Sequence, residues 1–177
     1  MAGKNVGKLL KEGGVIVALV SKDKYSEAEN LIAKESVAIQ KTCYVSLNKP
    51  YNTLVAAFTK SGIDVKKMVF VDSASSGFGE PKDGLKVVQI SSPKALTELN
   101  IAINKIIDGE KIKQLVFDSL STLLVYEQAS TVIKFSHSVI SKLRSAGVNA
   151  VFLALKEDVQ NELIKDLSMF VDKVAEI

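Results

Sequence analysis

The chain has 177 residues, of which 47% are hydrophobic, and its 23 Lys and Arg against 20 Asp and Glu give a net charge of +3. This length suits a single domain spanning residues 1–177, and the apolar content provides a sizeable core and argues against disorder. The charge is too small and the lysines too dispersed for a nucleic-acid-binding protein, so we expect a solvated charged surface.

The cysteine and histidine content excludes two further classes of site. One cysteine, Cys43, allows no internal disulfide, and together with one histidine, His137, it is too little for a zinc site. No apolar run approaches the roughly 20 residues that span a bilayer, and the N-terminus lacks a signal-peptide pattern. We therefore expect a cytoplasmic protein that contacts neither membrane nor nucleic acid.

Strands are predicted where short apolar runs rich in valine occur. Residues 1–14, which are polar and contain glycine, are expected to form a loose lead-in. Unbroken apolar runs are typical of strands buried on both faces of a parallel sheet. Such runs cover residues 15–20, 42–47, 68–72, 114–118 and 150–154, with weaker strands at 86–90 and near 170–175.

Helical patterns lie between these strands. They cover residues 24–35, 51–60 after Pro50, a segment opened by Ser92-Pro93, 129–146 and 157–168. Gly147 is placed to end the helix over 129–146. Strands alternating with helices predict an α/β fold, a three-layer sandwich with a mainly parallel central sheet. The one long loop is expected over Ser73–Gly84.

In such sheets ligands bind beyond the carboxyl ends of the strands, and two of these ends resemble a known family. Leu115-Val-Phe-Asp-Ser-Leu-Ser-Thr-Leu-Leu124 resembles the Walker B strand of RecA-like ATPases, especially of the KaiC type. Tyr44-Val-Ser-Leu-Asn-Lys-Pro50 resembles the second strand of that family. With the pattern from Lys142 to Asp172, the resemblance covers about residues 15–177 and extends to an archaeal group of KaiC-related proteins regarded as inactivated. It implies a RecA-like P-loop NTPase frame.

The chain departs from that family at the phosphate-binding loop. A Walker A loop needs glycines, whose backbone N–H groups cradle the phosphates, followed by Lys and Ser or Thr. Ser21-Lys-Asp-Lys-Tyr-Ser26 has no glycine. Asp23 or Ser26 can instead cap the next helix, and Ser26-Glu-Ala-Glu29 fits a capping box. We expect these side chains, with the charges of Glu27 and Glu29, to occupy the place of a phosphate.

The second departure concerns the catalytic base. The resemblance implies paired glutamates after the second strand, but the chain has Asn48-Lys49, and neither side chain is a general base at neutral pH. Asp118 alone is weak support for Mg²⁺. We predict no catalytic residue and no metal ligand. The remaining candidates are residues of a vestigial nucleotide site, namely Lys22, Lys24, Ser26, Asn48, Lys49, Asp118 and Ser119.

The leading hypothesis is a non-catalytic RecA/KaiC-like domain, an inactive ATPase homologue that acts through protein contacts in signalling or assembly. A protein partner or self-association is expected, with no cofactor. One alternative is a nucleotide-binding ATPase that holds ATP and Mg²⁺ with an aberrant loop, through Lys24, Ser26 and Asp118. Another is a site for a different small anion, formed by Lys22, Lys24 and Lys49.

A third alternative is a receiver-like signalling domain. Asp72, Ser119 and Lys156 follow strands in the order in which a receiver places its phosphorylated Asp, its hydroxyl and its Lys. The pair of acidic residues that a receiver domain has after its first strand is missing after Val20. The additional strand over 86–90 also gives the chain one strand more than the receiver order allows.

Overall fold

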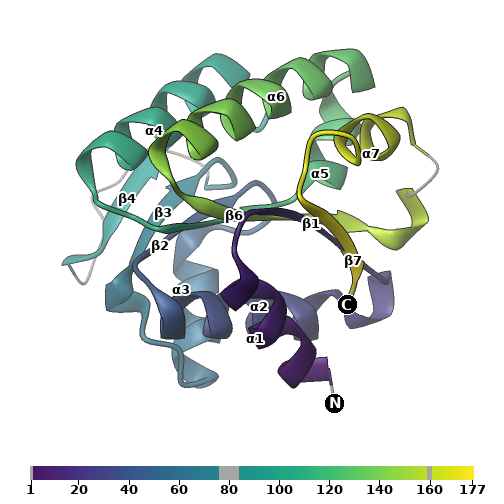
Figure 1. Cartoon of the computed structure of the whole chain (residues 1–177). Helices are drawn as coiled ribbons and strands as arrows, with labels where there is room; N and C mark the ends of the chain where they lie inside the picture. Colours follow the sequence, from purple (N-terminus) through teal and green to yellow (C-terminus); the bar gives the residue numbers. More distant parts are fainter. Residues whose placement is uncertain (1, 76–83, 159–160) are drawn as a thin grey trace.

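A parallel β-sheet forms the centre of the molecule (Figure 1). The computed structural model describes residues 2–75, 84–158 and 161–177. Within these ranges the sheet has seven strands in the order β4-β3-β2-β5-β6-β1-β7, and every neighbouring pair is parallel. The strands are β1 Val15–Val20, β2 Thr42–Ser46, β3 Met68–Asp72, β4 Lys86–Gln89, β5 Gln114–Asp118, β6 Asn149–Leu155 and β7 Lys173–Glu176.

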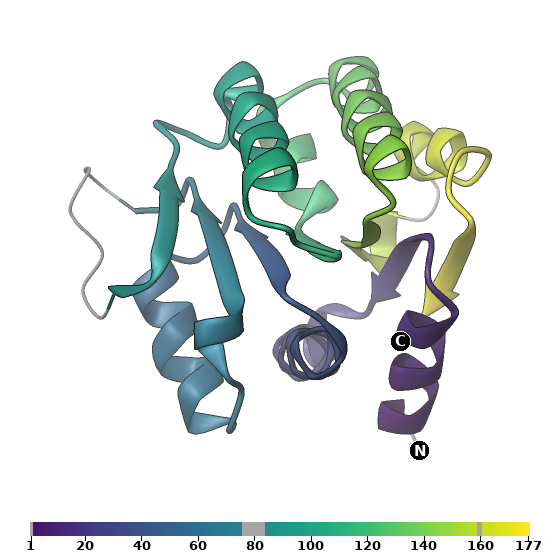
Figure 2. The same cartoon turned by 60° about the vertical axis from the view of Figure 1, so that its left-hand side comes forward.

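Helices cover both faces of the sheet (Figure 2). One face carries α1 Ala2–Glu12, α2 Tyr25–Ile39 and α3 Tyr51–Lys60, and the other carries α4 Leu96–Gly109, α5 Leu120–Tyr126, α6 Ala129–Ala146 and α7 Glu162–Leu167. Each helical layer buries its own apolar cluster against the sheet. The predicted three-layer α/β sandwich is therefore confirmed.

Most predicted elements are present. Cys43 is buried in β2, and burial raises the pKa of its thiol to about 12. Gly147 ends α6 in the left-handed region at φ 63°, as predicted. The helix expected from Ser92 begins only at Leu96, after a turn in which the Ala95 N–H donates to Ser92 O. The seven-residue α5 was not predicted, because it follows β5 almost directly and continues its apolar run.

The loose lead-in expected over residues 1–14 is wrong, because residues 2–12 form α1. Val6, Leu9 and Leu10 recur at helical spacing and are buried. Gly7 allows a close approach to α2, since a β-carbon there would lie 2.6 Å from Glu35 Oε2. The helical spacing of these apolar residues was not recognised in the sequence, because the segment is short and lysines and glycines separate them.

Two sequence predictions concern long loops and membranes. Residues 76–83 of the loop expected over Ser73–Gly84 lie outside the described residues. Among the described residues, no helix is both long and apolar enough to span a bilayer.

Candidate functional site

The candidate site lies at the carboxyl edge of the sheet, where β5 ends. Asp118 is the last residue of β5, pairs with Ser46 of β2 in the sheet register, and is completely buried. A cis peptide bond joins Asp118 to Ser119. Ser119 then caps α5, because its hydroxyl accepts a hydrogen bond from the Thr122 N–H at 3.2 Å.

Both carboxylate oxygens of Asp118 accept hydrogen bonds from tyrosines. The Tyr25 hydroxyl donates to Oδ1 at 2.5 Å, and the Tyr44 hydroxyl lies 3.1 Å from Oδ2. Tyr25 is the first residue of α2, whereas Tyr44 lies in the middle of β2. The helix that follows β1 is thus bonded through its first residue to the end of β5, across the intervening strand β6.

A second buried acid continues this polar cluster. Glu29 of α2 is only 3% exposed, and its Oε1 lies 3.3 Å from the Tyr44 hydroxyl. The Oε2 atom of Glu29 accepts a hydrogen bond from the ammonium group of Lys49, a residue of the segment after β2. Asp118, Glu29, Tyr25, Tyr44 and Lys49 therefore form one cluster with two carboxyl groups and one ammonium group, which we call the Asp118 cluster.

The surroundings of Asp118 favour its protonated form, which reduces the charge imbalance of the Asp118 cluster. Burial raises the pKa of Asp118 to about 7, and the nearby charge of Glu29 adds to the effect. Burial and the charge of Asp118 also raise the pKa of Tyr25 and of Tyr44 far above the ordinary value, so both tyrosines keep their protons. A protonated Asp118 can donate to the Tyr44 oxygen, which frees the Tyr44 proton for Glu29.

The segment after β1 is a tight turn. Lys22–Lys24 form a short 3-10 helix (η1), with the Lys24 N–H donating to Ser21 O at 3.0 Å, and α2 follows at Tyr25. Hydrogen bonds from the Ser21 hydroxyl and from the N–H groups of Asp23 and Lys24 lower the pKa of Asp23. The predicted cap of the next helix by Asp23 is wrong, because no side chain caps the start of α2, and the bonds of Asp23 stay within the turn.

The predicted capping box at Ser26 is wrong. Ser26 lies inside the first turn of α2, and no side chain caps the start of this helix. The Ser26 carbonyl accepts a hydrogen bond from the Asn30 side chain at 2.7 Å. Glu29 was expected to bring its charge to the helix start, but it is buried against Tyr44 and Lys49. A capping box requires Ser26 to precede the helix, whereas α2 already begins at Tyr25, whose hydroxyl bonds Asp118.

The other predicted site residues divide into two groups. The side chains of Lys22, Lys24 and Ser26 belong to exposed residues of the turn and of the start of α2. Asn48 instead lies beside α5, where its Oδ1 accepts a hydrogen bond from the Thr122 hydroxyl at 2.6 Å. Of the predicted set, only Asp118 and Lys49 belong to the buried Asp118 cluster.

An open cleft of about 320 Å³ lies beside the Asp118 cluster. It is lined by Tyr25, Asn48, Ser119, Ser121, Thr122, Val125, Tyr126 and Leu155. Several of its polar side chains are engaged with the protein itself. The Ser121 hydroxyl accepts a bond from the Leu155 N–H at 2.8 Å, and the Ser119 and Thr122 hydroxyls lie 3.0 Å apart. None of the described residues that line the cleft is cationic, and the nearby Lys94 ammonium lies 5.8 Å from the centre of the Tyr126 ring.

The residues of the receiver-like alternative lie apart. Asp72 ends β3 and accepts hydrogen bonds from the N–H groups of Tyr51 at 3.0 Å and Ala74 at 2.8 Å. Lys156 follows β6 and pairs with Glu176 of β7 at 2.6 Å. Because β2 and β5 separate β3 from β6, the fold does not bring Asp72 and Lys156 into one site.

Three residues of the Asp118 cluster were missed by sequence reasoning: Tyr25, Glu29 and Tyr44. Tyr25 and Glu29 are four residues apart, a spacing that places both on one face of a helix. Tyr44 is a polar aromatic residue within an otherwise apolar buried strand, and a buried tyrosine hydroxyl usually has a partner. In the described part of the chain, no three His, Cys, Asp or Glu side chains are grouped to hold a metal ion.

Comparisons with known proteins assign a family but no activity. Residues 44–177, well over half of the chain, match the sequence model of a family of unknown function (DUF7504), and the chain belongs to that family. A search of the curated proteins finds no match.

Proposed function

We propose that this member of DUF7504 is a non-catalytic domain on a RecA/KaiC-like frame, which acts through protein contacts in signalling or assembly. The observation that carries the proposal is the state of Asp118, the acid that would face a nucleotide-bound metal. Its side chain is completely buried and both oxygens are bonded to tyrosine hydroxyls. A metal ion would have to displace at least one tyrosine to reach it.

The residues around Asp118 do not fit Mg²⁺ and a triphosphate. A phosphate cradle needs a run of free backbone N–H groups. In the three-residue turn η1, the Lys24 N–H donates to Ser21 O at 3.0 Å and the Lys22 N–H to Glu157 Oε1 at 3.5 Å. The Lys49 ammonium, which could neutralise a phosphate or another small anion, is paired with the buried Glu29. The nearby hydroxyls of Ser119 and Thr122 bond each other and Asn48. These contacts support a site filled by the protein's own side chains.

Calorimetry and an ATPase assay test this proposal on the whole chain. We expect no heat when Mg-ATP at millimolar concentration is titrated into the protein, and no phosphate release above the uncatalysed rate. Asp118→Ala and Lys24→Ala should leave both results unchanged. ATP hydrolysis that Asp118→Ala abolishes would refute the proposal, and micromolar binding lost in Lys24→Ala would favour the ATPase with an aberrant loop.

A further inference from the structure

Strand β7 is an edge of the sheet with outward main-chain groups. Among the described strands, β7 pairs with β1 alone. The Ile177 N–H donates to Leu19 O of β1 at 3.0 Å. Because successive residues of a strand direct their main-chain groups to opposite sides, Lys173 and Ala175 face β1, and Val174 and Glu176 present N–H and C=O groups to the open side.

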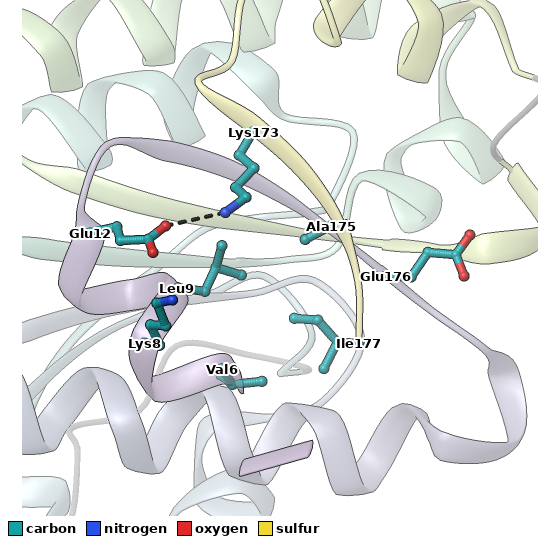
Figure 3. Close-up of a pocket in the computed structure, with 8 residues that line it drawn as sticks. All are labelled: Val6, Lys8, Leu9, Glu12, Lys173, Ala175, Glu176 and Ile177. Atoms are coloured by element: carbon teal, nitrogen blue, oxygen red, sulfur yellow. Dashed lines mark hydrogen bonds and ion pairs between the residues drawn. The ribbon is translucent and has the colours of Figure 1, made fainter. Parts of the chain in front are cut away.

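A groove of about 380 Å³ runs between this edge and α1. Figure 3 shows Val6 and Leu9 of α1 on one side of the groove, with Ala175 of β7 and Ile177, which follows it, on the other, so part of each wall is apolar. The Lys173 ammonium lies 3.2 Å from Glu12 Oε2 and links the two sides. An added strand would place alternate side chains over this groove.

We propose that a second copy of this chain pairs with the β7 edge, strand against antiparallel strand, with a two-fold axis through Ala175. In this register, Val174 opposes the partner's Glu176, and each pair exchanges two main-chain hydrogen bonds. Ala175 opposes its own copy at the close, non-hydrogen-bonded position, where a small side chain fits. The sheets of both copies become one continuous sheet.

The axis position follows from the strand geometry and the charges. Opposing residues of an antiparallel pair share one face of the sheet, so the axis passes through a residue and not between two. An axis through Val174 would put Asp172 opposite the partner's Glu176, and like charges directly opposite are destabilising. An axis through Ala175 places no like charges opposite each other within residues 173–177.

Charge also favours a second copy over a strongly charged partner. The groove has two lysines and two glutamates at its rim, Lys8, Lys173, Glu12 and Glu176, and is therefore electrically balanced. Glu176 is further paired with Lys156 at 2.6 Å. A second copy offers the same balanced set, and a symmetric pairing joins the two apolar grooves beneath the Ala175 pair. The proposed contact gives the protein-contact function above a surface and a partner.

Sedimentation equilibrium of the full chain tests the pairing, with three variants as probes. Wild type should associate to twice its 19.1 kDa mass. In a Val174→Glu dimer, the new glutamate of each copy lies opposite Glu176 of the other copy. This variant should raise the dissociation constant of the dimer at least about tenfold, a change of about 1.4 kcal/mol in binding free energy. Val174→Lys places Lys opposite Glu176 and should leave the dimer as tight or tighter. Val88→Glu is the matched control, because Val88 lies on the opposite edge strand β4 and is equally exposed, at 37%.

Three results would overturn the proposal. One is a wild type that stays monomeric at every concentration measured. The second is an equal weakening by Val174→Glu and Val88→Glu, which would mean a different surface. The third is an equal weakening by Val174→Glu and Val174→Lys, which would mean a different register. Circular dichroism of each variant separates lost pairing from lost folding. A monomer with no ATPase activity would refute this contact alone, whereas hydrolysis dependent on Asp118 would refute the proposed function.

Discussion

The contribution of Asp118 to the stability of this protein should fall as the pH rises from about 4 to about 7, because its carboxyl group holds a proton more tightly in the folded state than in the unfolded state. Its carboxyl group has an ordinary pKa of 3.8, and burial beside Glu29 raises that pKa to about 7 in the folded chain. Between these values the folded state keeps a proton that the unfolded state has released. The contribution is complete below the unfolded pKa and is lost as the pH rises through the folded one.

The size of this effect follows from the change in pKa. A difference of about three pH units between the folded and unfolded pKa corresponds to about 4 kcal/mol between pH 4 and pH 8, as an order of magnitude. Asp118→Asn keeps the shape of the side chain but does not titrate. We therefore expect the free energy of unfolding of Asp118→Asn, minus that of wild type, to rise by a few kcal/mol over this range.

Urea unfolding followed by circular dichroism at a series of pH values measures this difference. Exposed acids whose pKa is lowered, such as Glu98, are present in both proteins, so their opposite contribution cancels. Asp72→Asn is a matched control, because Asp72 also ends a strand and is 1% exposed, and the variant leaves Asp118 intact. Parallel curves for Asp118→Asn and wild type would refute a proton held on Asp118.

Three further predictions concern single contacts, each measured by urea unfolding. Tyr25→Phe should cost about 1–2 kcal/mol at pH 8, because the buried Asp118 carboxylate loses its shorter hydrogen bond; an unchanged stability would contradict the cluster. Lys49→Met should cost about 2 kcal/mol by leaving Glu29 buried without a cation, and adding Glu29→Gln should recover part of this loss. Gly147→Ala should cost about 1 kcal/mol through its φ of 63° alone, since a β-carbon there meets no atom within 4 Å; a larger loss would indicate a clash.

The sequence predicts the sheet better than it predicts the site. Strands such as β1 and β5 are buried on both faces, and this burial requires the continuous apolar runs by which they were found. Asp118 was found because it ends such a run. Its partners were not, because Tyr25 and Glu29 come from α2 and meet the residue only after the chain has placed β5 and β6 beside β1. Read along the sequence, Glu29 is one of several acids at the start of a helix.

The Asp118 cluster gives Lys49 a structural role beside Glu29. A glutamate at position 49 would put a third acid against Glu29, whereas Lys49 neutralises Glu29 and a proton neutralises Asp118. Both buried acids therefore have bonding partners within the chain. Lys49→Glu should therefore destabilise the carboxyl edge of the sheet, because it removes the cation beside Glu29 and adds a like charge.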